Sequence, residues 1–156
     1  MESWQRASRL RKEGREVVVL IGCGAKKRSG RHKAGDLYVG EYFKLCRSLA
    51  LLLVPTENVF VMSAKYGILS LDREVESYDL KVTNLSSNAY NRWKQKIRKF
   101  VLDKKQDGFT PVFICGKSYY DDLPGIKVLP VMGIGKQMQW MRGILSQGKG
   151  FGLCTE

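Results

Sequence analysis

"VVVLIGCGAKKR", residues 17–28, is the stretch that decides the fold prediction. Five consecutive apolar residues, Val17–Ile21, lead directly into Gly22 and Gly24 and then into a cluster of lysines and an arginine. An unbroken apolar run of this length is typical of a strand that is buried on both faces, as in a parallel sheet. Glycines and cations at the end of such a strand are typical of a ligand-binding loop.

Strand-like and helix-like segments alternate along the rest of the chain. Further strands are expected at residues 59–62, 111–115 and 127–131, and helices at residues 41–53, 88–102 and 136–145. This alternation implies crossover connections and helices on both faces of the sheet. We therefore expect an α/β fold, a three-layer sandwich with a short, four-stranded, mostly parallel sheet. Residues 1–156 are expected to form a single domain, with a basic N-terminal helix within residues 1–15 that packs on it or extends from it.

Charge points to a polyanionic partner. The 156 residues include 27 Lys and Arg against 15 Asp and Glu, a formal net charge of +12. Lysines and arginines that neutralise phosphates release counterions, so nucleic acid is the partner we favour, and DNA in particular. An anionic membrane surface and an acidic protein are the alternatives to nucleic acid that charge alone leaves open.

Cysteine usage argues against a metal or disulfide framework. Cys23, Cys46, Cys115 and Cys154 are widely spaced, and His32 is the one histidine of the chain. We expect free thiols, no metal and no cofactor. The polar N-terminus has no signal-peptide core, and the longest apolar run, residues 49–54, is too short to span a bilayer. The sequence thus predicts a soluble cytoplasmic protein with no membrane segment and no obligate protein partner.

Glycines and cations after the expected strands are candidates for gripping phosphate, because glycine lets the backbone approach a ligand and helix starts favour anions. The candidates are Gly22, Cys23, Gly24, Lys26, Lys27, Arg28, Lys117, Gly133, Gly135, Lys136 and Gln137. The dinucleotide and NTPase fingerprints do not match, because Lys27 and Pro111 occupy positions where those motifs need glycine. A solvated surface loop and ordinary glycine turns are the alternatives. Cys23 also fits a small packing residue better than a nucleophile.

Aromatic and hydroxyl side chains in the same loops suggest a pocket for a base, since a tyrosine ring can stack on one. The candidates for base binding are Tyr38, Ser63, Lys65, Tyr66 and Tyr78. Asp36 and Asp79 are the candidate catalytic acids, because a carboxylate can orient water or stabilise a cationic sugar. Helix capping by Asp36 and core packing by Tyr66 are the structural alternatives.

Several motifs together resemble a known group of proteins. They are "GCGAKK" at 22–27, "DLYVGEYF" at 36–43, "SAKYGIL" at 63–69, "SYDL" at 77–80 and "GIGKQMQW" at 133–140. This set is similar to small bacterial and phage proteins related to the YaaA group. The order of strands and loops also resembles the uracil-DNA glycosylase superfamily.

Such a resemblance implies an activity. It suggests an anti-phage DNA glycosylase that removes a modified base, glucosylated hydroxymethylcytosine, from phage DNA and leaves an abasic site. The superfamily's acid after the first strand and its histidine after the fourth strand are not matched, so Asp36 and Asp79 are the expected substitutes. The other functions left open are a non-catalytic DNA-binding or DNA-protecting protein, and an N-glycosidase or transferase that acts on free nucleotides.

Overall fold

The computed structural model describes the backbone of residues 2–150 and the side chains of residues 2–147, so Cys154 and the last residues of the expected domain lie outside it. The helices are α1 (Glu2–Lys12), α2 (Ala34–Leu37), α3 (Glu41–Leu53), α4 (Ser87–Gln106), α5 (Lys117–Tyr120) and α6 (Ile134–Gly150), with short 3-10 turns η1 (Thr56–Asn58) and η2 (Val82–Asn84). The strands are β1 (Val17–Gly22), β2 (Arg31–Lys33), β3 (Val59–Ser63), β4 (Gly67–Ser70), β5 (Glu74–Glu76), β6 (Thr110–Ile114) and β7 (Ile126–Lys127).

The central sheet has five strands in the order β4-β3-β1-β6-β7. β1 pairs in parallel with β3 and with β6, placing Val19 opposite both Val59 and Val112, and β6 pairs in parallel with β7. β4 runs antiparallel to β3. The α/β class and the mostly parallel pairing are therefore confirmed, whereas the count of four strands is wrong.

Two short antiparallel pairings were missed. β4 folds back on β3 through a three-residue loop that ends at Gly67, whose positive φ of 76° suits a tight hairpin. β2 and β5 form a separate two-stranded sheet. The fourth expected strand, residues 127–131, is reduced to β7, because Pro130 has no N–H to pair and the chain turns there toward α6.

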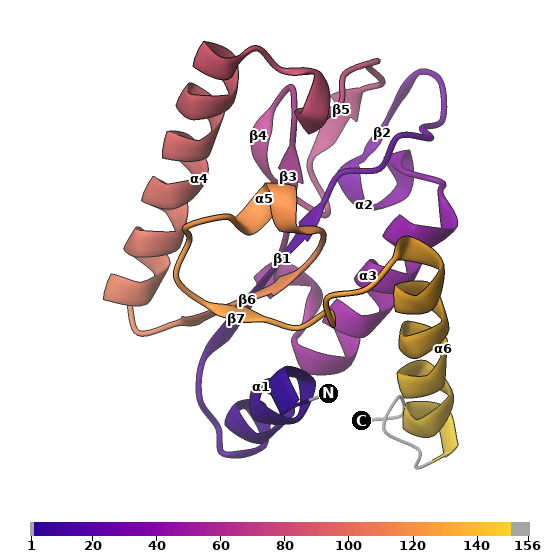
Figure 1. Ribbon diagram of the computed structural model, residues 1–156, viewed down its shortest axis with the longest axis vertical. Helices are drawn as coiled ribbons and strands as arrows, with labels where there is room; N and C mark the ends of the chain where they lie inside the picture. The colour runs from indigo at the N-terminus through magenta and orange to yellow at the C-terminus, as the bar shows by residue number, and fades with distance from the viewer. Residues whose placement is uncertain (1, 151–156) are drawn as a thin grey trace.

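Helices cover both faces of the sheet (Figure 1). Alternate residues of β1 separate the two cores: Val17, Val19 and Ile21 pack with α3 and α6, whereas Val18 and Leu20 pack with α4. α1 contacts α3, β1 and β7 at the end of the sheet away from α5. The expected burial of β1 on both sides is thus what its unbroken apolar run produces.

Helix positions agree closely with the sequence. α3 begins and ends at the expected residues, and Ser86 caps α4 by accepting a hydrogen bond from the Ala89 N–H at 3.1 Å. The basic N-terminal helix is α1, and its Arg11 donates to the carbonyl oxygen of Leu53 at the end of α3. Within residues 2–150, no helix has both the length and the apolar character needed to cross a membrane.

Candidate functional site

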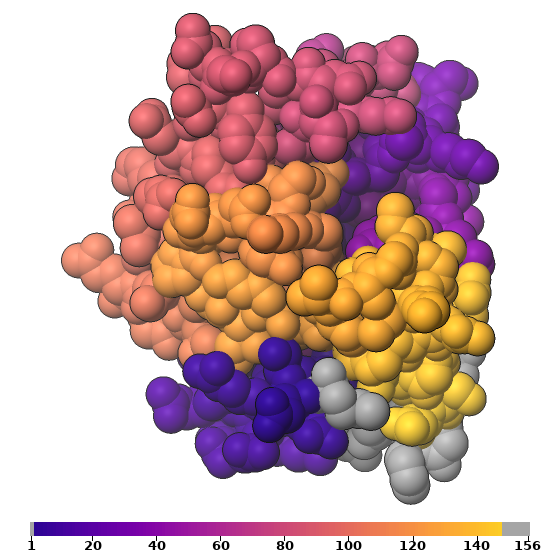
Figure 2. Space-filling view, viewed as in Figure 1, coloured from indigo at the N-terminus to yellow at the C-terminus, as the bar shows by residue number. Residues whose placement is uncertain are grey.

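A cavity of about 680 Å³ opens at the carboxyl end of the parallel strands. Its walls come from the loop after β1, the start of α3, the segment from Cys115 into α5, and residues of the stretch 129–138. The chain leaves β1 for β3 on one side and returns to β6 on the other, so the cavity lies where the strand order reverses. This is the usual position of a ligand site in an open α/β sheet. In Figure 2 the cavity corresponds to a hollow between the orange segment around α5 and the yellow start of α6.

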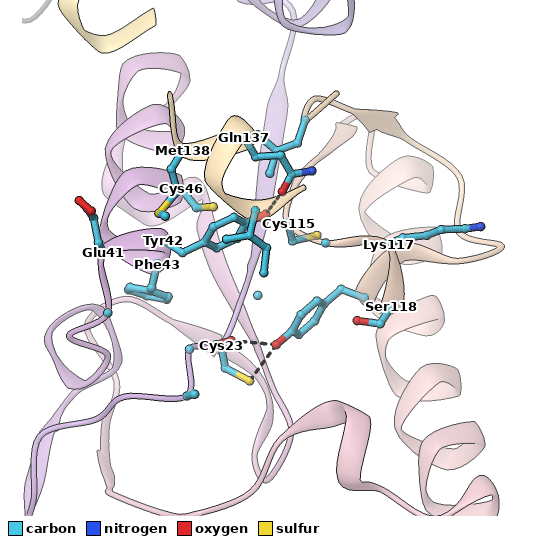
Figure 3. A pocket seen from close by; sticks show the side chains of 18 of the residues that line it. Cys23, Glu41, Tyr42, Phe43, Cys46, Cys115, Lys117, Ser118, Gln137 and Met138 are labelled. Carbon is cyan, nitrogen blue, oxygen red and sulfur yellow. Dashed lines mark hydrogen bonds between the residues drawn. The ribbon is translucent and has the colours of Figure 1, made fainter. Parts of the chain in front are cut away.

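The inner wall of the cavity is largely apolar. Tyr42, Phe43 and Cys46 reach it from successive turns of α3, and Met138 faces them from α6 (Figure 3). Cys46 is buried, and this burial raises the pKa of its thiol to about 12, so the thiol stays neutral. The wall therefore suits the faces of a flat, uncharged ring better than a phosphate.

Gln137 connects two sides of the cavity. Its Oε1 accepts a hydrogen bond from the Tyr42 hydroxyl at 2.6 Å, and its Nε2 donates to the carbonyl oxygen of Pro130 at 2.9 Å. Burial raises the pKa of Tyr42 above its usual value, which keeps this hydroxyl protonated as the donor. Gln137 thus connects α3 and α6 with the loop at Pro130. Both ends of its side-chain amide already make hydrogen bonds within the protein, so the amide is not free to bind a phosphate.

The rim of the cavity is electropositive. Lys26 and Lys117 are exposed residues of its lining, and Figure 3 shows the Lys117 side chain extending outward from the cavity. The N-terminus of α3 also faces it: Gly40 offers no side chain to cap this helix, so first-turn N–H groups remain for a ligand. Met132 and Ile134 bring the start of α6 to the same rim. An anionic group at the mouth of the cavity would be stabilised by these charges and dipoles.

Glu41 is the one carboxylate among the described residues that line this cavity. Arg142 donates to both of its oxygens, at 2.5 and 2.6 Å, and this pairing lowers the pKa of Glu41. Figure 3 shows its carboxylate turned away from the side chains that face the cavity. Glu41 is therefore placed to bind Arg142, not a ligand.

Three of the residues expected to bind a base, Tyr38, Ser63 and Tyr78, form a hydrogen-bonded cluster away from the cavity lining. Tyr38 and Ser63 are buried, Tyr66 and Tyr78 are half-buried, and Lys65 is exposed. The Tyr38 hydroxyl lies 2.7 Å from that of Tyr78, which in turn lies 2.8 Å from Ser63 Oγ. Ser63 Oγ also accepts the backbone N–H groups of Lys65 and Tyr66, so its own proton is directed to Tyr78. Tyr38 is 1% exposed and packs on Phe43, leaving no ring face open for a base.

Cations around this cluster are also partly engaged. Lys27 Nζ lies 4.4 Å from the centre of the Tyr78 ring, and Lys65 Nζ lies 5.3 Å from that of Tyr66. The Arg28 Nε donates to the backbone oxygen of Asp36 at 3.1 Å. The contacts of Lys27 and Arg28 stabilise the loop after β1, and that of Lys65 lies within the loop between β3 and β4. None of the three cations lines the cavity.

The expected catalytic acids lie elsewhere. Asp36, on α2, and Asp79, in the segment after β5, are both exposed, and neither borders the cavity. The cavity at the carboxyl end of the parallel strands is bounded by other segments, so these two carboxylates do not contribute to its lining. Within residues 2–150, no three His, Cys, Asp or Glu side chains gather closely enough to hold a metal ion.

Six of the expected phosphate-binding residues line the cavity: Gly22, Cys23, Gly24, Lys26, Lys117 and Gln137. Gly133, Gly135 and Lys136 are exposed at the start of α6, beside the lining rather than in it. The predicted site residues did not include Tyr42, Tyr119 or Tyr120, the three tyrosines that line the cavity. Tyr119 stands in a strand-end loop, a signal that was available, whereas the inward direction of Tyr42 depends on how α3 packs.

The fold and the cavity define an α/β protein with a ligand site at the point where the strand order of a parallel sheet reverses. Residues 18–143 match a family described as a family of unknown function (DUF6884), and the chain belongs to that family. No curated protein and no solved structure is similar enough to this chain to count as a match.

Proposed function

We propose that the protein is a DNA glycosylase that hydrolyses the N-glycosidic bond of a modified base and leaves an abasic site in the DNA. The observation that carries the proposal is the cavity, which combines an apolar interior with an electropositive rim at the carboxyl end of the parallel strands. The mostly parallel sheet, the sequence resemblance and the net charge of +12 support the same proposal. A role in defence against phages that carry modified DNA follows from the resemblance.

The size and lining of the cavity suit an extruded nucleotide. Binding sites for small organic ligands usually measure roughly 300–1,000 Å³, and the volume of about 680 Å³ leaves room beyond a single unmodified ring. An enzyme that acts on a base in a duplex must first turn it out of the stack. Phe43, Tyr42 and Met138 would then contact the base, while Lys26 and Lys117 bind the flanking phosphates.

The chemistry proposed is electrostatic. When the bond between C1′ and the base nitrogen breaks, the base leaves with the electron pair and the sugar becomes oxocarbenium-like; water then adds to C1′ and releases a proton. The N–H groups at the start of α3 stabilise negative charge on the departing base, which then takes up the proton that the water releases. Asp36 and Asp79 lie off the cavity, so this chemistry assigns them no part in activating water.

Incubation with duplexes that carry unmodified or modified cytosine, followed by alkali, tests the proposal because alkali cuts abasic strands. We expect cutting at the modified base, and a loss of at least tenfold in rate for Gly116→Leu. Gly116 lines the cavity, and no heavy atom lies within 4 Å of the position that a Cβ would take there, so a side chain can leave the backbone at this position without a clash and add bulk. Gly143→Leu is the matched control, because Gly143 has the same open surroundings on α6 but does not line the cavity.

Substitution of the two former candidates belongs to the same experiment. Asp36→Asn and Asp79→Asn are expected to keep the rate within about threefold of the wild type, a difference of less than about 0.7 kcal/mol in barrier. A loss of a hundredfold or more would return catalysis to those carboxylates. Intact strands with every duplex would contradict the glycosylase proposal itself.

A non-catalytic reader of modified DNA is the second candidate. It is favoured by one observation, that no carboxylate among the described residues faces the cavity. A reader would bind the modified duplex more tightly than the unmodified one and release no base. Release of free base from mononucleotides, without action on polymer, would instead indicate an enzyme of nucleotide metabolism.

A further inference from the structure

Tyr119 lines both the main cavity and a second, smaller one. The second cavity measures about 190 Å³ and shares five lining residues with the first, namely Cys23, Gly24, Ala25, Ser118 and Tyr119. Its remaining walls are Leu80, Lys81 and the first two residues of η2, Val82 and Thr83. Because Tyr119 belongs to the wall that the two cavities share, displacement of its side chain would connect them.

Two contacts with Cys23 hold the Tyr119 side chain in place. The hydroxyl donates to the Cys23 carbonyl oxygen at 2.8 Å, and its oxygen lies 3.4 Å from Cys23 Sγ. Since the one hydroxyl proton goes to the carbonyl, the thiol is the donor in the second contact. The dashed lines at Cys23 in Figure 3 mark this pair of contacts.

Gly22 makes the position of the ring possible. A Cβ at Gly22 would lie 2.7 Å from Tyr119 ring carbons, closer than any real contact. The backbone of Gly22 is ordinary extended strand, paired in register with Met62, so alanine is acceptable there except for the ring. Gly22→Ala therefore displaces Tyr119 without other strain.

The backbone beneath Tyr119 is fixed by α4. The carbonyl oxygen of Ser118 accepts hydrogen bonds from the Tyr90 hydroxyl at 2.8 Å and from Lys94 Nζ at 3.4 Å. Lys94 is 7% exposed, so this anchor is buried. Arg98 donates to the Asp122 carbonyl oxygen at 3.0 Å, which holds the end of the same segment. Motion of Tyr119 is thus confined to its side-chain torsions.

The two cavities differ in chemistry. The main one is walled by Tyr42, Phe43 and Met138, whereas the second is bordered by the polar groups of Lys81 and Thr83, which do not line the first. A flat ring fits the first, and a group that donates and accepts hydrogen bonds fits the second.

We propose that Tyr119 is a specificity-determining residue, which swings aside when a base with a polar, hydroxyl-bearing substituent enters and lets that substituent occupy the second cavity. The inference rests on the proposed function, because it assumes that the main cavity holds a base. Movement disrupts the two contacts with Cys23, the packing on Gly22 and an edge contact with the Trp93 ring. The hydrogen bonds that the substituent makes with the polar wall of the second cavity replace them.

Duplexes with cytosine, hydroxymethylcytosine or glucosylated hydroxymethylcytosine at one position test this inference. The readouts are the cleavage rate and, in parallel, the equilibrium Kd of each duplex. We expect Tyr119→Ala to raise the preference for the glucosylated over the hydroxymethyl base at least fivefold. Gly22→Ala should shift the preference in the same direction, Tyr119→Phe by less, and the double variant Gly22→Ala/Tyr119→Ala no further than Tyr119→Ala alone.

Gly143→Ala is the control for the glycine substitution and should leave the preference unchanged, because this residue lies outside both cavities. Circular dichroism and the thermal midpoint check folding, and Tyr119→Phe and Gly22→Ala carry the test if Tyr119→Ala does not fold. If Tyr119→Ala lowered the cleavage rate and affinity equally for all three bases, the inference would be overturned, and Tyr119 would only line the cavity without setting its specificity. Cleavage of no base contradicts the proposed function alone, since the ratios of Kd still report whether Tyr119 sets the preference.

Discussion

Tyr38 shows what burial does to a side chain that the sequence assigns to a binding site. Its ring fills the core between α3 and the tyrosine cluster, and its hydroxyl is bonded to Tyr78. Burial raises the pKa of Tyr38 to about 12, above the value of 10.0 for a free tyrosine. The ionised form is therefore the unfavourable one in the folded protein, and Tyr38 contributes to structure rather than to recognition.

The alkaline stability of the protein follows from this shift. Above pH 10 the unfolded chain loses a tyrosine proton that folded Tyr38 keeps, so the stabilisation is complete below pH 10 and is lost as the pH rises toward 12. One such group lowers the free energy of unfolding by about 1.4 kcal/mol per pH unit in that window. In urea titrations between pH 9 and 11.5, the free energy of unfolding should fall less steeply with pH for Tyr38→Phe than for the wild type. Parallel curves would contradict the burial of this hydroxyl.

At the residue scale, the sequence predicts which side chains lie close together, but not whether they are exposed to a cavity or buried in the core. Tyr38, Ser63 and Tyr78 were expected to meet because their segments lie at the same end of the sheet, and they do meet. Whether a tyrosine there faces a cavity or the core depends on the helix that covers it, here α3 with Phe43. No local pattern of residues carries that information.

Element boundaries were predictable where local chemistry sets them. α3 runs from a glycine to a proline, and α4 starts at a capping serine, so both starts could be placed from the sequence. β2, β4 and β5 were not predicted, because strands of three or four residues are too short to show a clear periodicity. The cavity was predicted only in part, because its walls also depend on how α3 and α6 pack against the sheet.

The capping of α4 by Ser86 can be tested directly by substitution. Its Oγ accepts the Ala89 N–H, whereas Ser87 is the first exposed residue of the helix with no such bond among the described contacts. Ser86→Ala is expected to lower the free energy of unfolding by about 1 kcal/mol, because one orphan donor at the start of α4 loses its partner. Ser87→Ala, measured by the same urea titration, should change it by no more than about 0.3 kcal/mol. If Ser86→Ala and Ser87→Ala lowered the free energy of unfolding equally, Ser86 would not be the residue that caps α4.

At the scale of the whole molecule, net charge does not locate the site. Basic residues occur at both ends of the sheet: Lys26 and Lys117 at the cavity, and those of α1 and the end of α4 at the opposite end. The sequence therefore predicts attraction to a polyanion without saying where it binds. Only the position of each lysine relative to the cavity distinguishes a specific contact from general attraction.

Salt dependence of DNA binding makes that distinction measurable. Lys26→Ala/Lys117→Ala and Lys12→Ala/Lys105→Ala each remove two exposed lysines, so both lower the formal net charge of +12 by two. If DNA sits over the cavity, the first pair should reduce the slope of log K against log salt concentration by about 2, since each phosphate contact releases about one counterion. The second pair, remote from the cavity, should leave the slope within about 0.5 of the wild type, a margin set by its loss of long-range attraction alone. Equal reductions in the two variants would mean that DNA is held by the overall charge of the protein, and the cavity would then have no privileged role in binding it.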